Sequence, residues 1–169
     1  MSKKVYLWVE LGLQTINDKT AENFNRGYKF EVFKEGIKKL QDRGIEVVVH
    51  SIFGLPGETK EDMLRTIDYI AHSGAQGIKF HLLHLMKNTK MAEQYYNGEF
   101  ELLSEEDYID LICQGISMIP EEMVVHRLTG DAPRATLIGP MWSLKKWEVL
   151  NAIDKALVDR DIWQGKNFK

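Results

Sequence analysis

The stretch Val47-Val-Val-His-Ser-Ile-Phe-Gly-Leu-Pro-Gly-Glu-Thr59 decides the fold of this chain. Three consecutive valines are typical of a strand that is buried on both faces, and a Gly/Pro turn and a capped helix follow the strand directly. In parallel α/β proteins the ligand lies beyond the carboxyl ends of the strands, where this turn would be placed. We therefore expect a ligand site at this turn, with His50 beside it.

Length and composition predict one ordinary globular domain and disfavour several classes of function. The chain has 169 residues, 44% hydrophobic and 28% charged, so we expect residues 1–169 to form a single domain. A net charge of −3 disfavours a broad nucleic-acid-binding surface. The sequence has no apolar run long enough to cross a bilayer and no leader pattern, so we expect a cytoplasmic protein without a membrane role.

Cysteine usage limits the chemistry that the chain can carry by itself. Cys113 is the single cysteine, which excludes an internal disulfide and a multi-cysteine metal or iron–sulfur site within the chain. It falls in a helical stretch, where we expect a small, partly buried residue and not a reactive thiol.

Strand and helix patterns alternate along the chain. We expect strands at residues 5–13, 45–53, 77–85 and 123–128. Helices are expected after four capping positions, at Asn17-Asp18, Thr59, Ser104 and Ser143. This order predicts a parallel sheet wound by right-handed crossovers. Because a full eight-fold barrel needs about 250 residues, the chain is either part of a barrel or a small open sheet.

Alternation in the first strand separates an aliphatic face from a polar one. Glu10, Gly12 and Gln14 share one face, whereas the aliphatic side chains at the odd positions from 5 to 13 share the other. A carboxylate and an amide are costly against packed helices, so the polar face should point into a barrel lumen or cleft. We expect Glu10, Gln14 and His50 to line one concave wall that binds a cofactor or another polar ligand.

Further polar residues near strand and helix ends are candidate ligands. The forked geometry of Arg26 suits a carboxylate, although a solvated surface arginine is the commoner interpretation. His81 and His84 suggest a metal site, but a three-residue step along a strand would point them to opposite faces, which disfavours zinc. The segment His126-Arg127-Leu-Thr-Gly-Asp131 is either a ligand-binding segment or an ordinary strand exit.

Several segments together resemble the second half of a radical S-adenosylmethionine (radical SAM) enzyme core. They are Glu10-Leu-Gly-Leu-Gln-Thr15, Asn25-Arg-Gly27 and His50-Ser-Ile-Phe-Gly-Leu-Pro-Gly-Glu-Thr59 with Asp62-Met63. With Lys79-Phe-His-Leu-Leu-His84 and His126-Arg-Leu-Thr-Gly-Asp131, the whole chain resembles an uncharacterised bacterial group of Fe–S oxidoreductase-like proteins. That group is related to oxygen-independent coproporphyrinogen oxidase and to the radical-SAM subunit of Elongator.

This resemblance implies a fold, a reaction and two cofactors. The chain would form an α/β partial (β/α) barrel of about four mainly parallel strands, the second half of a (β/α)6 barrel plus a C-terminal helix. The earlier strands would precede Met1. In the family, a [4Fe–4S] cluster held by a CxxxCxxC loop cleaves S-adenosylmethionine (SAM) to a 5′-deoxyadenosyl radical. This chain lacks the loop. We therefore expect SAM and the cluster in a full-length parent and no cofactor in this fragment. The fragment would be inactive alone.

The resemblance also assigns roles to the candidate residues. Gln14 and Arg26 would contact the ribose and methionine portions of SAM, and the backbone at Leu85 and Met86 would face its adenine. His50 would stand where the coproporphyrinogen oxidase relatives carry an acid. The substrate-side candidates are His81, His84, His126, Arg127 and Asp131, and we expect no metal ligands in this chain.

Two other hypotheses remain at this point. The chain could be a non-catalytic α/β module that binds a small ligand or a partner through the same strand face. A barrel-type metal-dependent hydrolase would instead require His50, His81 and a carboxylate to meet at one metal ion. For the enzyme hypothesis, the substrate is a small metabolite or an RNA. Because half a barrel exposes an open strand edge, we also expect a homodimer formed through that edge.

Overall fold

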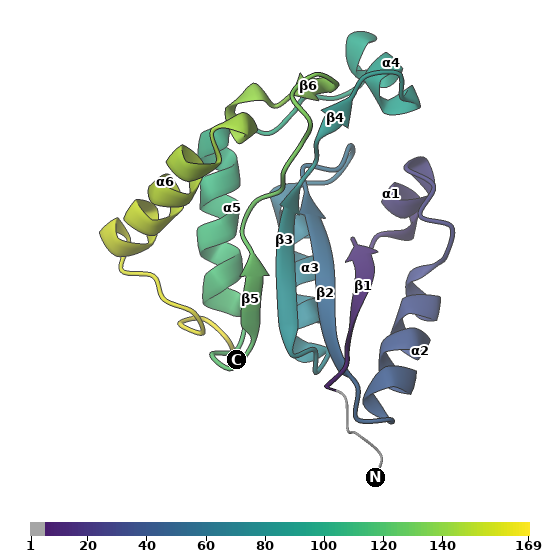
Figure 1. Ribbon diagram of the computed structural model, residues 1–169, viewed down its shortest axis with the longest axis vertical. Helices are drawn as coiled ribbons and strands as arrows, with labels where there is room; N and C mark the ends of the chain where they lie inside the picture. Colours follow the sequence, from purple (N-terminus) through teal and green to yellow (C-terminus); the bar gives the residue numbers. More distant parts are fainter. Residues whose placement is uncertain (1–5) are drawn as a thin grey trace.

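Four parallel strands form the central sheet of this protein, of which the computed structural model describes residues 6–169 (Figure 1). The strands lie in the order β1 (Trp8–Gln14), β2 (Glu46–Phe53), β3 (Gly77–Leu82) and β5 (Val124–Arg127). All three neighbouring pairs are parallel. The expected α/β arrangement of about four mainly parallel strands is therefore confirmed. Val5, the predicted start of the first strand, lies outside the described residues.

Helices cover one face of this sheet and leave the other face open. In Figure 1, α3 (Lys60–His72) lies behind β2 and β3, with α2 (Phe30–Gln41) and α5 (Glu105–Met118) on either side of it. The last helix, α6 (Lys146–Asp159), packs on α5. Within residues 6–169, every helix falls short of the length and apolar character that a bilayer crossing requires.

Small elements gather at the end of the sheet where the strands terminate. Figure 1 shows α1 (Asp18–Asn23) and α4 (Lys90–Tyr96) at this end. Strands β4 (Leu85–Met86) and β6 (Leu137–Gly139) form a separate antiparallel pair that the sequence did not predict. A 3-10 turn, η1 (Met141–Leu144), then leads into α6.

The core lies between the covered face of the sheet and the helices. Val47, Val49 and Phe53 of β2 are buried there, whereas His50 points to the open face because successive strand side chains alternate. Cys113 of α5 is also in this core, more deeply buried than the sequence predicted.

The helix starts show where local sequence signals succeed and where they fail. The caps predicted at Asn17, Thr59 and Ser104 all form, and the one at Thr59 is a complete capping box. The cap predicted at Ser143 is wrong, since its hydroxyl donates to the carbonyl of Pro140 at 2.7 Å within η1. The helix begins only at Lys146, without a side-chain cap.

The third strand is shorter than its apolar pattern suggests. It ends at Leu82, so alternation does not extend to His84. A Cβ built on Gly130 would lie 3.0 Å from the His84 ring and 3.8 Å from the His81 ring. The two imidazoles therefore border the same stretch of backbone, and their predicted placement on opposite faces is wrong.

Thr59→Ala should weaken α3 without disturbing the core. Removing the hydroxyl leaves the Asp62 N–H without its cap, so we expect the free energy of unfolding to fall by about 1 kcal/mol in urea denaturation. Thr59→Ser, which keeps the hydroxyl, is the matched control and should retain most of the stability. Equal stability of the alanine variant and the wild type would contradict the assigned cap.

Candidate functional site

The carboxylate of Glu10 connects three strands on the open face of the sheet. Lys79 Nζ of β3 donates to Glu10 Oε2 of β1 at 2.6 Å, and His50 Nε2 of β2 lies 2.8 Å from the same oxygen. Within residues 6–169, Glu10 Oε1 receives no hydrogen bond, and the Glu10 side chain is 37% exposed. One carboxylate oxygen is thus held by the protein and the other is available to a ligand. The predicted convergence of Glu10 and His50 is observed.

The contacts between Glu10, Lys79 and His50 determine the protonation states of Glu10 and His50. The hydrogen bond from Lys79 is the main cause that lowers the pKa of Glu10 to about 2, and His50 lowers it further. Burial lowers the pKa of His50, although Glu10 opposes this effect. At neutral pH Glu10 is ionised, and His50 is neutral and can donate its Nε2–H to the carboxylate.

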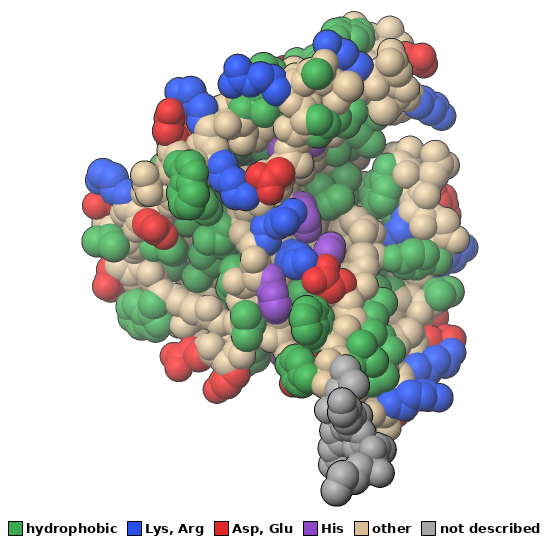
Figure 2. Space-filling view, in the orientation of Figure 1, with side chains coloured by type: hydrophobic (Ala, Val, Ile, Leu, Met, Phe, Trp, Pro, Cys, Tyr) green, Lys and Arg blue, Asp and Glu red, His purple; other side chains and the backbone are tan. Residues whose placement is uncertain are grey.

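His81 and Arg127 extend the polar face toward β5. The His81 and His50 ring centroids are 5.1 Å apart, and Arg127 pairs with Lys79 in the strand register. Burial, followed by the neighbouring His50 and Arg127, lowers the pKa of His81 to about 4. Its buried Nε2 atom has no hydrogen-bond partner in the described part of the chain. Figure 2 shows histidine, basic and acidic side chains gathered across the middle of this open face.

The other substrate-side candidates lie around this group and not within it. The ring of His126 covers Gly77, where a Cβ would collide with it. His84 lies beyond the end of β3, and its Nε2 atom is buried without a partner among residues 6–169. Both oxygens of Asp131 accept hydrogen bonds from Lys146 Nζ, each at 2.9 Å.

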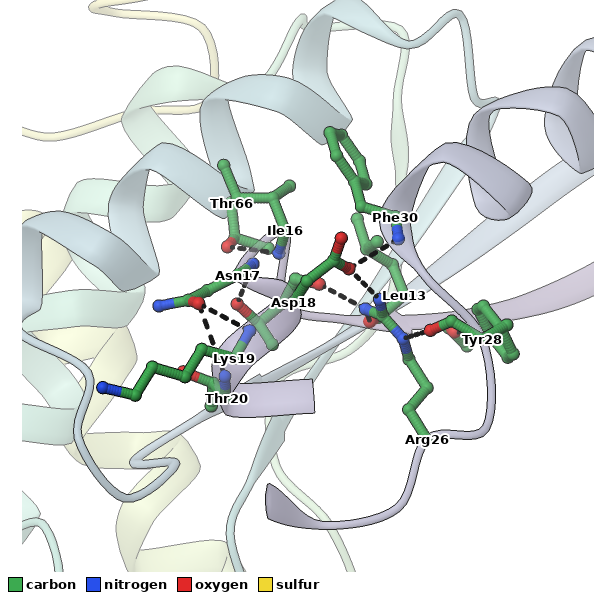
Figure 3. A network of polar contacts seen from close by, with 12 residues as sticks. Leu13, Ile16, Asn17, Asp18, Lys19, Thr20, Arg26, Tyr28, Phe30 and Thr66 are labelled. Atoms are coloured by element: carbon green, nitrogen blue, oxygen red, sulfur yellow. Dashed lines mark hydrogen bonds and ion pairs between the residues drawn. The ribbon is translucent and has the colours of Figure 1, made fainter. Parts of the chain in front are cut away.

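Arg26 is buried, and its guanidinium ties the end of β1 to the segment before α2 (Figure 3). Only 2% of its side chain is exposed. Nη1 donates to the carbonyls of Leu13 and Thr15 at 2.9 and 2.6 Å. Nε donates to the carbonyl of Tyr28, and Nη2 donates to the Asp18 carboxylate, each at 2.9 Å. The interpretation as a solvated surface arginine is wrong, and the SAM contact stays a prediction.

Gln14 lies at an irregularity that ends β1. Its φ of 59° is left-handed, and the register with β2 shifts between Gly12 and Gln14. Its amide folds back over Gly12, within hydrogen-bond distance of the carbonyls of Gly12 and Leu13. Gln14 therefore covers the residue that pairs with His50, and its predicted contact with SAM remains to be tested.

Leu85 and Met86 belong to the small antiparallel sheet. Leu85 pairs with Gly139, and Met86 pairs with Leu137. Together with His84 they line a hollow of about 300 Å³ at the end of the main sheet. The adenine contact predicted for their backbone stays a prediction.

Two charged residues have environments that the sequence analysis did not single out. Lys79 pairs with His50 in the register and shares the direction of His81, so strand alternation could have identified it. Glu58 accepts a hydrogen bond from Thr15, and burial raises its pKa. Its second oxygen has no partner within residues 6–169. Nothing in the local sequence signals this burial, because Glu58 directly precedes the helix cap at Thr59, where acidic residues are ordinarily solvated.

The described residues do not supply the donor set of a metal-dependent hydrolase. Among residues 6–169, no group of three or more His, Cys, Asp or Glu side chains is arranged to hold a metal ion. The meeting of His50, His81 and a carboxylate at one metal, which that hypothesis requires, is therefore not found in this structure.

Two protein families match consecutive parts of the chain. Residues 2–70 match the Radical SAM superfamily, and residues 75–159 match the Radical_SAM C-terminal domain. The second match alone spans half of the chain.

Curated relatives match nearly the whole chain. The uncharacterized protein YtqA of Bacillus subtilis is 50% identical over 169 residues, which is 100% of this chain and 52% of YtqA. Protein YhcC of Escherichia coli is 35% identical over 156 residues, which is 92% of this chain and 50% of YhcC. The chain therefore spans about half the length of these curated relatives.

A solved structure shares the fold. The Elp3 of the archaeon Methanocaldococcus infernus, with an N-terminal deletion, superposes with a TM-score of 0.82 and 21% identity. The match covers 94% of this chain and 37% of that chain. At this identity the likeness is evidence for the fold alone.

Glu10 should titrate far below an ordinary glutamate. We expect NMR of its carboxyl carbon to give a pKa of about 2, and Lys79→Met to raise that pKa toward the ordinary 4.5. Because the pKa is lower in the folded protein, ionised Glu10 stabilises the fold above about pH 4.5, and this contribution is lost as the pH falls through about 2. Lys60→Met, which removes an exposed ion pair with Asp107, is the control. A wild-type Glu10 pKa near 4.5 would contradict the geometry.

Arg26→Lys should destabilise the end of β1 although the charge is kept. A lysine cannot reproduce the fork that reaches three carbonyls and a carboxylate at once. The free energy of unfolding should therefore fall by at least about 2 kcal/mol. Urea denaturation measures this loss. Arg43→Lys, at an exposed arginine, is the control and should be neutral. A neutral Arg26→Lys variant would show that the network does not hold the strand end.

Proposed function

The chain belongs to the radical SAM superfamily, and from that premise we propose that it forms the SAM-binding and substrate-facing part of an enzyme that cleaves SAM reductively. The observation that carries the proposal is the Glu10 carboxylate, which Lys79 and His50 hold through one oxygen on the open face of a parallel sheet. Its second oxygen has no protein donor in the described part of the chain.

The residues of the open face fit the polar groups of SAM. SAM carries an ammonium group and ribose hydroxyls, which need acceptors, and the free oxygen of ionised Glu10 is one. His81 and Gln14 add an imidazole and an amide to the same region. SAM bound together with a [4Fe–4S] cluster would supply the radical chemistry, and the residues of the open face would hold SAM for it.

The cluster does not fit residues of this chain. Cys113 is its single cysteine, and its side chain is fully buried. We propose that the cluster ligands belong to another part of a longer protein, in keeping with the half-length coverage of the relatives. The isolated chain would then be inactive.

Each residue of the group has a separate task in this proposal. Lys79 keeps Glu10 ionised and fixes its position, and His50 donates a second hydrogen bond without adding positive charge at neutral pH. Arg26 holds the end of β1, so that the backbone bearing Glu10 and Gln14 keeps its path.

The setting of the protein is part of the same proposal. We place it in the cytoplasm, acting on a small metabolite or an RNA. The chain alone would form a homodimer through the free edge of β1, where Tyr6, Leu7 and Trp8 are exposed.

The proposal predicts that the full-length protein forms 5′-deoxyadenosine. After anaerobic reconstitution of its cluster and addition of a reductant, liquid chromatography with mass spectrometry should detect the nucleoside. Glu10→Gln should raise the dissociation constant for SAM by about 10- to 100-fold, the value of one charge-assisted hydrogen bond, and lower nucleoside formation accordingly.

Glu35→Gln provides the matched control for that experiment. Glu35 pairs with Lys39 on an exposed face of α2 and should leave SAM affinity unchanged. A reconstituted wild-type protein that forms no 5′-deoxyadenosine would favour the non-catalytic module. Wild-type SAM affinity in Glu10→Gln would show that Glu10 is not the contact.

A further inference from the structure

Arg127 is a cation on the open face that forms no ion pair with the described residues 6–169. Its strand pairs with β3, where its register partner is Lys79, and its side chain is half-buried. Among residues 6–169 it has no hydrogen-bond or ion-pair partner. The nearby carboxylates are engaged, because Glu10 is held by Lys79 and Asp131 is held by Lys146. A half-buried guanidinium of this kind loses hydration without compensation from the protein.

Two neutral groups near Arg127 have polar atoms without a hydrogen-bond partner among residues 6–169. Arg127 pairs with Lys79 in the strand register, next to the strand that carries His81, and its positive charge contributes to the lowered pKa of His81. The buried Oγ1 of Thr129, like Nε2 of His81, has no partner in the described part of the chain. Arg127 and Thr129 also line a hollow of about 450 Å³ beside β5. A cation beside unpaired hydrogen-bonding groups is the complement of an oxyanion.

We propose that Arg127 binds an oxyanion of the substrate, a carboxylate or a phosphate group, on the open face of the sheet. This assignment rests on the proposed function, because it places the substrate beside SAM on that face. The planar guanidinium can donate two parallel hydrogen bonds to such a group. Lys79 adds positive potential nearby, but its own ammonium is engaged by Glu10.

SAM also carries a carboxylate, and the placement of Arg127 favours the substrate over SAM as the source. Two strands separate β1, which bears Glu10, from β5, which bears Arg127. At about 4.8 Å between neighbouring strands, the two backbones are roughly 14 Å apart. The ammonium and carboxylate of SAM share one carbon atom, so a molecule held by Glu10 through its ammonium keeps its carboxylate near β1.

Protection of Arg127 from phenylglyoxal tests this assignment. The reagent modifies free guanidinium groups, and mass spectrometry of the full-length protein resolves the rate at each arginine. We expect inorganic phosphate or acetate to slow modification of Arg127 saturably, by about tenfold at roughly ten times its dissociation constant. The anion with the stronger effect identifies a phosphate-bearing or a carboxylate-bearing substrate. Arg43, exposed on the far side of the sheet, is the internal control and should react at an unchanged rate.

Three results would overturn the assignment. Protection of Arg127 by SAM alone would identify the carboxylate of SAM as the ligand. Equal rates with and without each anion would show that no oxyanion binds there. An Arg127 that does not react even without anions would show that its guanidinium is already covered. The outcome is independent of the 5′-deoxyadenosine assay, so failure of this inference and failure of the proposed function are distinguishable.

Discussion

The ion pair between Glu10 and Lys79 depends on the register of three parallel strands. Glu10, His50 and Lys79 come from β1, β2 and β3, and they meet because each points to the face without helices. A one-residue slip in any of these strands would turn its charged or polar side chain into the core, where an unpaired charge is costly. The native register of the three strands therefore places these polar side chains on one face. A sheet formed in this register also assembles the candidate site.

Arg26 and Arg127 differ in how far their charges are used by contacts within the protein. Arg26 donates to three carbonyls and a carboxylate of its own chain, so its charge is used in holding the end of β1. Arg127 is half-buried on β5 and has no such contacts among the described residues. The same division separates the two oxygens of Glu10, since Lys79 and His50 fix one and no donor of residues 6–169 contacts the other. Unsatisfied groups on the open face, and not charge alone, indicate where a ligand would bind.

Sequence patterns predicted the sheet, three of the four expected helix caps and the meeting of Glu10 with His50. These features depend on strand alternation and on the residues at the helix starts. The patterns failed where long-range contacts decide. Arg26 is buried because it donates to the carbonyls of Leu13 and Thr15 at the end of β1. The sequence around Arg26 does not indicate this contact. Strands β4 and β6 have only two and three residues, too few for a periodic signal. His84 was placed by extending an alternation past Leu82, where the strand already ends. Lys79 could have been identified from the same strand alternation that placed His81, and it was not singled out.

A crystal structure of the full-length protein with bound SAM tests the central claim most directly. The account predicts the ammonium group or a ribose hydroxyl of SAM within hydrogen-bond distance of Glu10 Oε1, while Lys79 and His50 remain on Oε2. SAM bound away from the open face of β1 and β2, or a Glu10 carboxylate with both oxygens engaged by protein groups, would contradict it.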